Sequence, residues 1–539
     1  MTMLLDAMKG LIGREARWCR LGLASIAGML LAGAGFAAPL SGAAIVQQKC
    51  GACHLEGGKL QRLPGLRKTP EGWDMSIARM QVWHKVEISK DERRALVKYL
   101  SDKQGLAPEE SAPYRFLMER RPNSQDVLPD EELGQMCARC HSFGRVALQR
   151  RDAGEWAKLV HTHLGQFPSI EYSAQGRDRN WKEIALGQTA PKLAALYPAN
   201  AAAWKKWQAK KHALPTGSWR IAGHRPGAGD YAGTMKVDAL GDDRYDVRYE
   251  LNFVSGNRMH GRGTSIMYSG YEWRGDATIG NQKIRSVFAL SEDGKTISGR
   301  WFMRESDELG ASFTAVPSGA AARPAIVAVF PSILKAGATT RLSVHGVQLG
   351  KGFDLGPGIT VLSVEKQNAD EAELTVSVAE HAAVGLRTLR GQGGKGEAAL
   401  AVYRQFDSVR VEPESALARV GGGTNAPLSA QFEAVAYLNG PDGKAGSADD
   451  VRLGVVPATW SVDNHDEKAR LADDVSFAGV MEPHGLFVPA GAGPNPLRKG
   501  MNNVGDLTVI ASVADGARSN EARARLVVTV QSWNKPPLR

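Results

Sequence analysis

The sequence predicts a multidomain chain in which a mainly α-helical N-terminal region is followed by three all-β domains. The chain has 539 residues, too many for one core at roughly 150 residues per domain. The pattern C-x-x-C-H occurs twice, both times in the first third of the chain and near segments with helical periodicity. From about residue 213 the sequence changes to short alternating runs separated by glycine-containing turns, which are typical of antiparallel β domains.

Residues 1–38 have the composition of a secretory signal peptide. Four cations between Lys9 and Arg20 precede the apolar run "LGLASIAGMLLAGAGFAA", which ends in small residues at Ala38. This order predicts cleavage near Pro39 and export of the mature chain. The alternative is an uncleaved anchor, because the run only just reaches the length of a membrane span, but its density of Gly and Ala favours cleavage.

Cysteine usage singles out the two C-x-x-C-H motifs. Of five cysteines, Cys19 lies in the predicted signal, and the others are Cys50, Cys53, Cys137 and Cys140. Local disulfides and a four-thiolate zinc site are alternatives, but neither needs the histidine that follows each pair. Covalent attachment of haem c uses all three residue types, because the thiols bond to the haem vinyl groups and the imidazole binds the iron. We therefore predict a dihaem cytochrome c domain over residues 39–212, with His54 and His141 as proximal iron ligands.

An internal repeat divides this domain into two haem units, about 39–104 and 105–212. Aligning Trp73 in "TPEGWDMSIARMQVWH" with Trp156 in "DAGEWAKLVHTHLGQF" places Met80 opposite His163. These two residues are the predicted sixth ligands. A methionine ligand raises the reduction potential relative to a second histidine, so the two haems would differ in potential. The rival ligands are His84 and Met75 in the first unit and His161 in the second; the alternative reading makes all of them ordinary core or surface residues.

The segment "ISKDERRALVKYLSD" predicts the helix that closes the first unit. Ser89 and Glu92 have the spacing of a capping box, and three apolar residues, Leu96, Val97 and Leu100, share one face. In small c-type cytochromes such a terminal helix packs on the attachment helix.

Residues 213–322 predict an antiparallel β domain, either a barrel, which is favoured, or a sandwich. The run "RYDVRYELNF" has apolar or aromatic residues at every second position from Tyr245 to Phe253, as in a strand with one buried face. The segment "SEDGKT" supplies an Asp-Gly turn. His224 and His260 are expected in turns or on the surface rather than as metal ligands.

Two immunoglobulin-like domains, residues 323–407 and 408–539, are predicted to follow. The last contains the loop "NGPDGKAGSADD", which gathers Asp442, Asp449 and Asp450 around glycines. A calcium loop is one interpretation, but the spacing does not match an EF-hand, and a solvated turn is favoured.

Composition and motifs exclude several function classes. The net charge of +10 is dispersed, without a long Lys/Arg block, so nucleic-acid binding is not expected. No segment after the signal is long and apolar enough to span a membrane. No Ser/His/Asp order, Walker loop or dinucleotide fingerprint occurs in the β domains, so no catalytic residue is predicted in this chain.

The order of these parts resembles the alpha subunit of quinohemoprotein amine dehydrogenase. The resemblance is carried by "KCGACH" with "TPEGWDM", by "MCARCH" with "EWAKLVHTHLGQFPS", and by "YSGYEWRG" and "SGRWF" in the first β domain. It covers essentially the whole mature chain. The haem motifs alone are generic to c-type cytochromes, and their order with the β domains is the more specific evidence.

The resemblance implies a periplasmic heterotrimer with a β-propeller subunit and a small subunit. In that family the small subunit carries cysteine tryptophylquinone, which oxidises a primary amine to an aldehyde and ammonia. Electrons then pass to the two haems and on to a soluble acceptor such as azurin or a cytochrome. A thioether-linked quinone needs a cysteine, and the predicted haems use every mature cysteine here, so the quinone is expected on the partner.

Three other functions are alternatives to this one. A stand-alone dihaem redox enzyme such as a peroxidase would need an open or displaceable sixth position at one haem. A plain electron carrier would leave the long β region without a role. An adhesion protein would leave the haem doublet unexplained.

Overall fold

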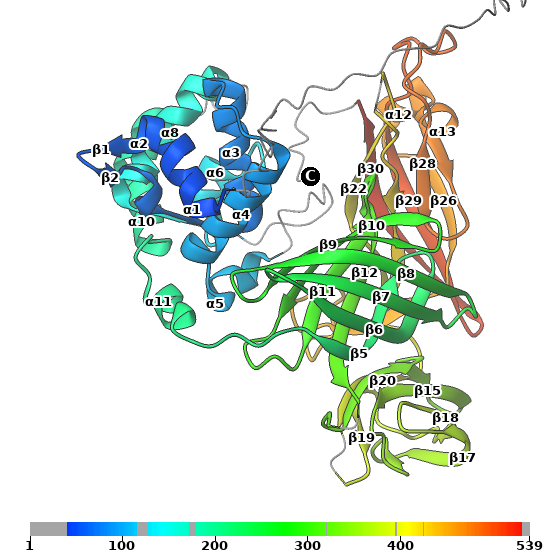
Figure 1. Ribbon diagram of the computed structural model, residues 1–539. Helices are drawn as coiled ribbons and strands as arrows, with labels where there is room; N and C mark the ends of the chain where they lie inside the picture. Colours follow the sequence, from blue (N-terminus) through cyan, green and yellow to red (C-terminus); the bar gives the residue numbers. More distant parts are fainter. Residues whose placement is uncertain are drawn as a thin grey trace, which may run out of the picture. The chain divides into compact units, whose positions relative to one another are not determined.

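The structure, a computed structural model, describes residues 40–115, 128–171, 179–319, 321–393, 396–423 and 425–530. The predicted signal peptide, residues 1–38, lies outside these residues. Within them the predicted fold class is confirmed. Helices dominate as far as α11 (Ala202–Gln208), and strands dominate from β5 (Gly217–Arg225) onward. Figure 1 draws the helical part in blue and cyan and the strands from green to red.

The first C-x-x-C-H motif lies at the end of an unbroken helical segment. This segment consists of α1 (Gly42–Ile45), η1 (Val46–Cys50) and α2 (Gly51–His54). The elements that follow are β1 (Leu55–Glu56), β2 (Lys59–Leu60), η2 (Leu63–Gly65), β3 (Leu66–Lys68), α3 (Pro70–His84), α4 (Lys90–Gln104), α5 (Pro108–Ser111) and η3 (Ala112–Tyr114).

Helix α3 begins and ends where its sequence dictates. The Thr69 side chain accepts a hydrogen bond from the backbone N–H of Gly72, and Pro70 occupies the first helical position, where its missing N–H costs nothing. The helix ends at His84, because the next residue, Lys85, has a φ of 55° in the left-handed region, which stops helix propagation.

Helix α4 closes the first unit as predicted. Ser89 and Glu92 form the capping box at its start, which is confirmed. Its three predicted core residues are buried in one cluster with residues of the attachment segment: Ile45, Val46, Leu96, Val97 and Leu100. The packing of the terminal helix on the attachment helix is therefore confirmed.

The second motif follows a shorter helix. Its elements are α6 (Glu131–Cys137), α7 (Gly144–Ala147), β4 (Gln149–Arg151), α8 (Ala153–Gln166), η5 (Pro168–Glu171), α9 (Trp181–Ile184), η6 (Ala185–Thr189) and α10 (Ala190–Leu196). Their buried apolar residues form a separate cluster that includes Phe143, Trp156 and Trp181. Helix α11, placed by the sequence in this unit, instead packs Trp204 and Trp207 into the cluster of the barrel.

A two-stranded ribbon joins the two haem units. Strand β3 of the first unit pairs antiparallel with β4 of the second, with Arg67 opposite Arg150 and Lys68 opposite Gln149. Because side chains alternate along a strand, Arg67 and Arg150 share one face of the ribbon, and Lys68 and Arg151 share the other.

Eight antiparallel strands close into a barrel in the order β10-β11-β12-β5-β6-β7-β8-β9. Beyond β5, they are β6 (Gly229–Gly241), β7 (Arg244–Phe253), β8 (Arg258–Tyr268), β9 (Glu272–Ile279), β10 (Gln282–Leu290), β11 (Ile297–Met303) and β12 (Ser306–Ser318). The predicted alternation in β7 is confirmed, because its buried residues fall at every second position.

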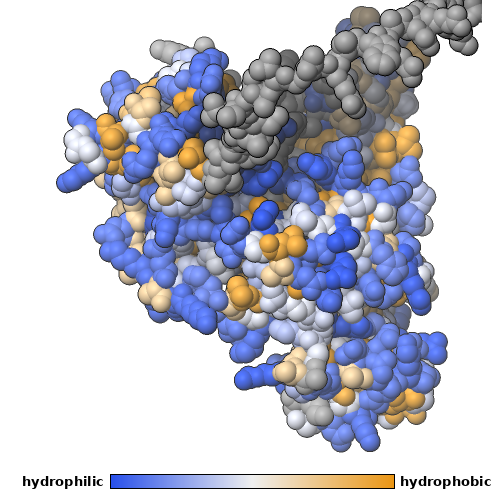
Figure 2. All heavy atoms as spheres, viewed as in Figure 1, coloured by the Kyte–Doolittle hydropathy of each residue, from blue (hydrophilic) through white to orange (hydrophobic). Residues whose placement is uncertain are grey.

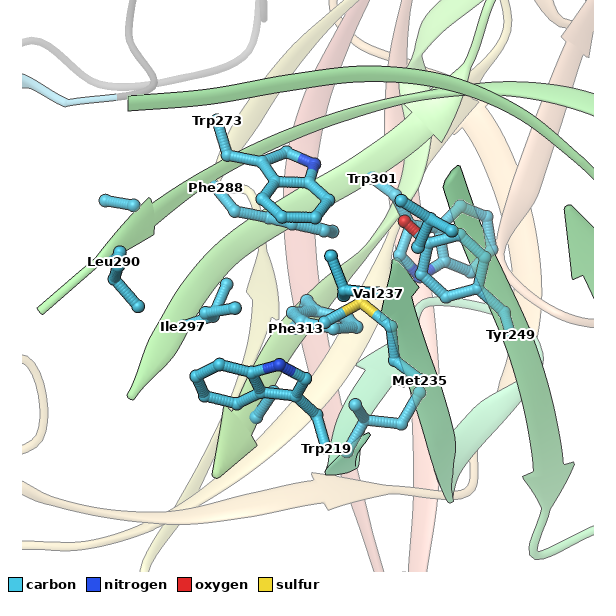
Figure 3. Packing of buried hydrophobic residues seen from close by; sticks show 14 of the residues in the cluster. Trp219, Met235, Val237, Tyr249, Trp273, Phe288, Leu290, Ile297, Trp301 and Phe313 are labelled. Atoms are coloured by element: carbon cyan, nitrogen blue, oxygen red, sulfur yellow. The ribbon is translucent and has the colours of Figure 1, made fainter. Parts of the chain in front are cut away.

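Aromatic side chains fill the barrel. Trp219, Trp273 and Trp301 are each at most 2% exposed, and Figure 3 shows them pointing into the interior with Phe288 and Phe313. The Phe288 and Phe313 rings stack with centroids 4.1 Å apart. An eight-stranded barrel is just wide enough for side chains to fill it, so this interior is a packed core.

Two β domains follow. The first has sheets β13-β15-β18-β17 and β14-β20-β19-β16, made of β13 (Ala325–Phe330), β14 (Ile333–Lys335), β15 (Thr339–Val347), β16 (Phe353–Asp354), β17 (Ile359–Gln367), β18 (Glu371–Val378), β19 (Gly385–Gly391) and β20 (Glu397–Tyr403). One buried apolar cluster draws on both sheets, as in a sandwich.

The last domain has three sheets, β21-β24-β25, β22-β30-β29-β26 and β23-β28-β27. Its elements are β21 (Ser408–Glu412), β22 (Ser415–Arg419), β23 (Ala430–Gln431), β24 (Glu433–Leu438), β25 (Val451–Val456), β26 (Thr459–Asn464), α12 (Glu467–Ala472), α13 (Asp474–Phe477), β27 (Gly479–Met481), β28 (Leu486–Pro489), β29 (Gly505–Asp515) and β30 (Arg518–Thr529). The small third sheet and the two short helices are additions to the predicted sandwich.

Buried polar contacts tie the helical region to the barrel. Arg274 of β9 forms an ion pair with Glu71 of α3. The Trp207 indole N–H donates to the Ser269 carbonyl at 2.8 Å.

On the face shown in Figure 2, exposed apolar residues are scattered among hydrophilic ones. None of the helices in the described part of the chain combines the length and the apolar character needed to cross a membrane.

Candidate haem sites

The two cysteine pairs differ in local structure. Cys50 and Cys53 lie one turn apart on the attachment segment, whereas Cys137 is the last residue of α6 and Cys140 lies in the bend after it. All four are free thiols, which does not fit the disulfide alternative. Burial raises the pKa of the Cys50 thiol, and burial with the nearby Asp130 charge raises that of Cys137 to about 12.

The zinc alternative also lacks support from the geometry. Among residues 40–115, 128–171 and the other described ranges, no group of three or more His, Cys, Asp or Glu side chains is placed to hold a metal ion. The four thiols are therefore not gathered into one site.

In the second unit, His141 and His163 lie across from one another. Their ring centroids are 6.4 Å apart. A metal–imidazole bond is about 2 Å long, and a ring nitrogen lies roughly 1 Å from its centroid, so two imidazoles on opposite sides of one metal have centroids about 6 Å apart. The observed spacing matches two axial ligands of one iron.

Backbone carbonyls fix the tautomer of both rings. His141 Nδ1 donates to the Ser142 carbonyl at 2.9 Å, and His163 Nδ1 donates to the Leu159 carbonyl, one helical turn earlier, at 2.9 Å. A carbonyl can only accept, so Nδ1 carries the proton and Nε2 carries the lone pair with which imidazole binds metals. Burial lowers the pKa of His163, the Leu159 hydrogen bond opposes this shift, and the charges of Arg79 and Arg151 add to it; a lowered pKa favours the neutral form that binds metals.

Two aromatic residues lie beside His163. The rings of Phe167 and Trp181 lie 6.4 and 6.3 Å from that of His163. The Trp181 indole N–H donates to the Met136 carbonyl at 3.0 Å and so links α9 to the attachment helix α6. The sequence analysis did not single out Trp181, because its role depends on a contact between distant segments. The rival ligand His161 is exposed.

In the first unit, His54 has two candidate partners on α3. Burial is the main cause that lowers the pKa of His54, and the charges of Arg62 and His84 add to it, so His84 lies within electrostatic range of His54. Met80 and His84 are separated by one helical turn and share a face of α3. The Met80 side chain is half-buried, and so is that of the further rival, Met75.

The repeat relates the two distal helices residue by residue. Trp73 and Trp156 are both 2% exposed and lie on the faces that carry Met80 and His163 respectively. At the same alignment His84 corresponds to Phe167, which lies beside His163 rather than replacing it.

These residues fit haem c as a group. Each motif supplies two thiols and an imidazole. In the second unit a further imidazole, that of His163, lies 6.4 Å from the His141 ring, close enough for both to bind one iron. The Trp156 indole N–H is buried without a hydrogen-bond partner among the described residues, which is expected where a polar group of a missing cofactor belongs.

One contact missed by the sequence analysis joins the two units. Both guanidinium groups on one face of the ribbon bind Glu110 of α5: Arg67 donates at 2.8 and 2.7 Å, and Arg150 at 3.1 Å. The sequence gives one hint of these arginines, because basic residues stand just before each distal helix, in "RLPGLRKTP" and "VALQRRDAG". The acid between them lies 40 residues from Arg150, and local patterns give no hint of the pairing.

The other flagged residues lie away from the haem units. His224 lies on β5 rather than in a turn and contacts Asp230 at 2.7 Å and Glu433 at 2.6 Å. His260 is exposed on β8. In the acidic loop, the carboxylates accept hydrogen bonds from nearby backbone and Ser447 groups. Two of them are exposed, as in a solvated turn, whereas the side chain of Asp450 is buried and forms an ion pair with Arg410. The residues concerned are Asp442, Asp449 and Asp450.

Four family models match the chain in order. The description "Quinohemoprotein amine dehydrogenase A, alpha subunit, haem binding" matches residues 40–204. Models for alpha subunit domains II, III and IV of quinohemoprotein amine dehydrogenase match residues 212–318, 323–404 and 409–538. A comparison with curated proteins gives no match.

Three solved structures illustrate the structural similarities of this chain. A redesigned β-barrel, mFAP1, bound to DFHBI is 14% identical, with 19% of this chain and 94% of that chain covered, at a TM-score of 0.18. Mouse clustered PcdhgC3 EC1-3 is 15% identical, with 44% and 76% covered, at 0.16. The Bacteroides ovatus mixed-linkage glucan protein SGBP-B is 12% identical, with 59% and 65% covered, at 0.19. Scores this low carry no argument.

Proposed function

The chain belongs to the family of quinohemoprotein amine dehydrogenase alpha subunits, and from that membership we propose that it is the dihaem electron-transfer subunit of such an enzyme. It carries the haem-binding domain of an oxidoreductase complex of several subunits. In our proposal it accepts electrons from a cysteine tryptophylquinone on a partner subunit during oxidative deamination of primary amines. It passes them to a soluble acceptor, azurin or a cytochrome.

The observation that carries the proposal is the His141–His163 pair beside a C-x-x-C-H motif. The pair has the spacing of two axial ligands of one iron. We assign covalent haem c to Cys137 and Cys140, with His141 as the proximal ligand and His163 as the sixth ligand. The family match to a haem-binding model over residues 40–204 supports the assignment.

The first haem is assigned by the same motif and by the repeat. Cys50 and Cys53 are the attachment residues, and His54 is the proximal ligand. Met80 is the proposed sixth ligand because it corresponds to His163, whereas His84 corresponds to Phe167, a neighbour of the ligand. One His/Met haem and one His/His haem would differ in reduction potential.

The chain's own residues hold and tune these groups. When bound, each haem supplies an iron that takes up and gives up one electron at a time. The carbonyls of Ser142 and Leu159 orient the two imidazoles and raise their basicity. The buried ring of Trp181 packs beside His163. Glu110, bound to Arg67 and Arg150, holds the two units in one arrangement.

The catalytic quinone is proposed to lie on a small partner subunit. A thioether-linked quinone needs a cysteine, and all four cysteines outside the predicted signal are assigned to haem. We propose a heterotrimer with that small subunit and a β-propeller subunit, assembled in the periplasm after cleavage of the signal at residues 1–38.

Co-purification tests this function. An affinity-tagged chain, expressed with its signal in its native host and purified from the periplasm, is separated on a denaturing gel. Haem staining should mark the band of this chain, because thioether bonds survive denaturation. Quinone staining should mark a small co-purified polypeptide and leave this chain unstained. A haem-stained chain that purifies alone, or one that consumes peroxide at enzymic rates, would support the stand-alone redox enzyme or carrier instead.

A further inference from the structure

The ribbon between the two haem units is basic on both faces, and only on one face does a single carboxylate hydrogen-bond to both of the cations. On the first face, Arg67 and Arg150 bind the buried carboxylate of Glu110. Lys68 and Arg151 on the second face are equally buried, each 5% exposed. The two faces of the ribbon can therefore be compared directly. Their cations are similar in number and burial, but the carboxylates that contact them differ.

The second face has few partners within the chain. The Lys68 ammonium donates to the Ser76 hydroxyl at 2.5 Å and lies 5.4 Å from the centre of the Trp73 ring. Arg151 donates to the Gln149 side chain at 2.8 Å and lies over the Trp156 ring at 5.7 Å. The nearest carboxylate, Glu155, is 3.8 Å from the Arg151 guanidinium.

That carboxylate is already occupied. Glu155 accepts two hydrogen bonds of 3.0 Å from Arg62 and another of 3.0 Å from Lys158. Its one negative charge is shared by Arg62, Lys158 and Arg151, and Lys68 forms no ion pair with it. Burying a charge without a partner costs several kcal/mol, so an anion from outside the polypeptide is expected here.

Two further arginines extend the second face into a cluster. Arg79 of α3 and Arg145 of α7 have no hydrogen bond or ion pair between their guanidinium groups and any other described residue. The charge of Arg79 helps to lower the pKa values of Lys68, Arg145 and Arg151, after burial in each case, so the four groups lie within electrostatic range. We call Lys68, Arg79, Arg145 and Arg151 the cationic cluster.

The cluster adjoins the second haem site and draws on both units. Arg79 and Arg151 act electrostatically on His163, although Arg79 comes from the distal helix of the first unit. The indole N–H of Trp156, beneath Arg151, is an unpartnered buried donor at the same place. Carboxylates are bound by such groups, cations together with neutral hydrogen-bond donors.

We propose that the cationic cluster binds the propionate carboxylates of the haems, an assignment that rests on the dihaem function proposed above. Haem c carries its propionates on the edge opposite the vinyl groups, so they lie away from the cysteines. The propionates supply the negative charge that Glu110 supplies on the other face. Because the cluster contains residues of both units, it couples the two haems through one set of charges.

The proposal predicts a change in reduction potential. Reduction adds negative charge to a haem, and a buried cation beside it favours the reduced form. The variants Lys68→Met and Arg151→Gln are each purified as the holoprotein complex. In a spectroelectrochemical titration, each should show a lower reduction potential of at least one haem than the wild type. A third variant, Arg145→Gln, should give a smaller shift in potential, because Arg145 is only half-buried.

The other face of the ribbon supplies the matched control. Arg150→Gln removes an equally buried cation but leaves Glu110 bound by Arg67, and it should leave both potentials near those of the wild type. Lys68→Arg keeps the charge and should restore the wild-type potential. Inorganic phosphate, added to the wild type as a probe for a free anion, should leave both potentials unchanged.

Two results would overturn the proposal. One is wild-type potentials in Lys68→Met, Arg151→Gln and Arg145→Gln with both haems present. The other is a phosphate-dependent shift in the wild type, which would assign the site to a free anion. A chain that carries no covalent haem would contradict the proposed function itself, and mass spectrometry of the same samples distinguishes that case.

Discussion

At the scale of single residues, the proposed second haem site contains two imidazoles whose orientation is set by backbone carbonyls. His163 is held by the carbonyl of Leu159 on its own helix, and His141 by that of its neighbour Ser142. Local hydrogen bonds of this kind cost little entropy, because the partners are already close in the sequence. The two imidazoles are therefore pre-organised to bind an iron.

Replacing His163 should open the second haem. His163→Ala removes the imidazole opposite His141, and we expect a high-spin or ligand-exchangeable haem, detected by its absorption spectrum and by binding of added imidazole. His161→Ala is the control, because His161 is exposed two residues away. If His161→Ala instead gives the high-spin haem, the repeat alignment assigns the wrong histidine.

Replacing Met80 should affect only the first haem. Met80→Ala should abolish the sulfur-to-iron charge-transfer absorption and lower that haem's reduction potential, since a thioether ligand favours the reduced iron. His84→Ala, one turn further along the same face, should leave the absorption band in place. Loss of the sixth ligand in His84→Ala with a normal spectrum in Met80→Ala would make His84 the ligand.

At the scale of elements, the features that the sequence predicts are those encoded by a few neighbouring residues, and contacts between distant segments are not predicted. Ser89 and Glu92 predict the start of α4 because a capping box needs only four consecutive residues. The alternation in β7 predicts its buried face for the same reason. The pairing of β3 with β4 brings together residues more than 80 positions apart, and no local pattern encodes it.

Helix α4 should contribute measurably to the stability of the first unit. Leu96 is 0% exposed, and Leu96→Ala should lower the free energy of unfolding by about 2–5 kcal/mol through lost burial and the cavity left behind. Urea unfolding of the holoprotein, followed by haem absorbance, measures this. Val82→Ala on α3, at a residue 61% exposed, should change it by less than about 0.5 kcal/mol. Equal effects of the two variants would contradict the packing of α4 on the attachment segment.

At the scale of the whole molecule, domain order could be predicted from the sequence, but contacts between domains could not. The change from helical to alternating patterns near residue 213 marks the boundary of the barrel. Helix α11 has an ordinary helical pattern, yet its Trp204 and Trp207 complete the core of the barrel. Likewise His224 gives no sign in the sequence of its contact with Glu433 in the last domain.

The His224 contacts should make stability depend on pH. Burial opposes protonation, but hydrogen bonds and charges of Asp230 and Glu433 outweigh it and raise the pKa of His224 to about 9. The stabilisation is thus fully present below the unfolded value of about 6.5 and is lost as pH rises through about 9. His224→Gln should lower the free energy of unfolding by up to about 3 kcal/mol at pH 6, and the difference from wild type should vanish near pH 10.

Unfolding by urea, followed by tryptophan fluorescence at several pH values, measures this difference. His260→Gln is the matched control, because His260 is exposed on β8 of the same barrel and should show no such pH dependence. A His224→Gln difference that stays constant from pH 6 to pH 10 would contradict the electrostatic role of the contact.

The measurement that tests the central claim most directly is reduction of the haems by an amine, with and without the partner subunits. The purified alpha chain, given a primary amine under anaerobic conditions, should keep the absorption spectrum of oxidised haem. Addition of the quinone-bearing subunit and the remaining partner should make the same amine reduce the haems. Reduction by amine in the isolated chain, or no reduction in the reconstituted complex, would contradict the role of this chain as the electron-transfer subunit.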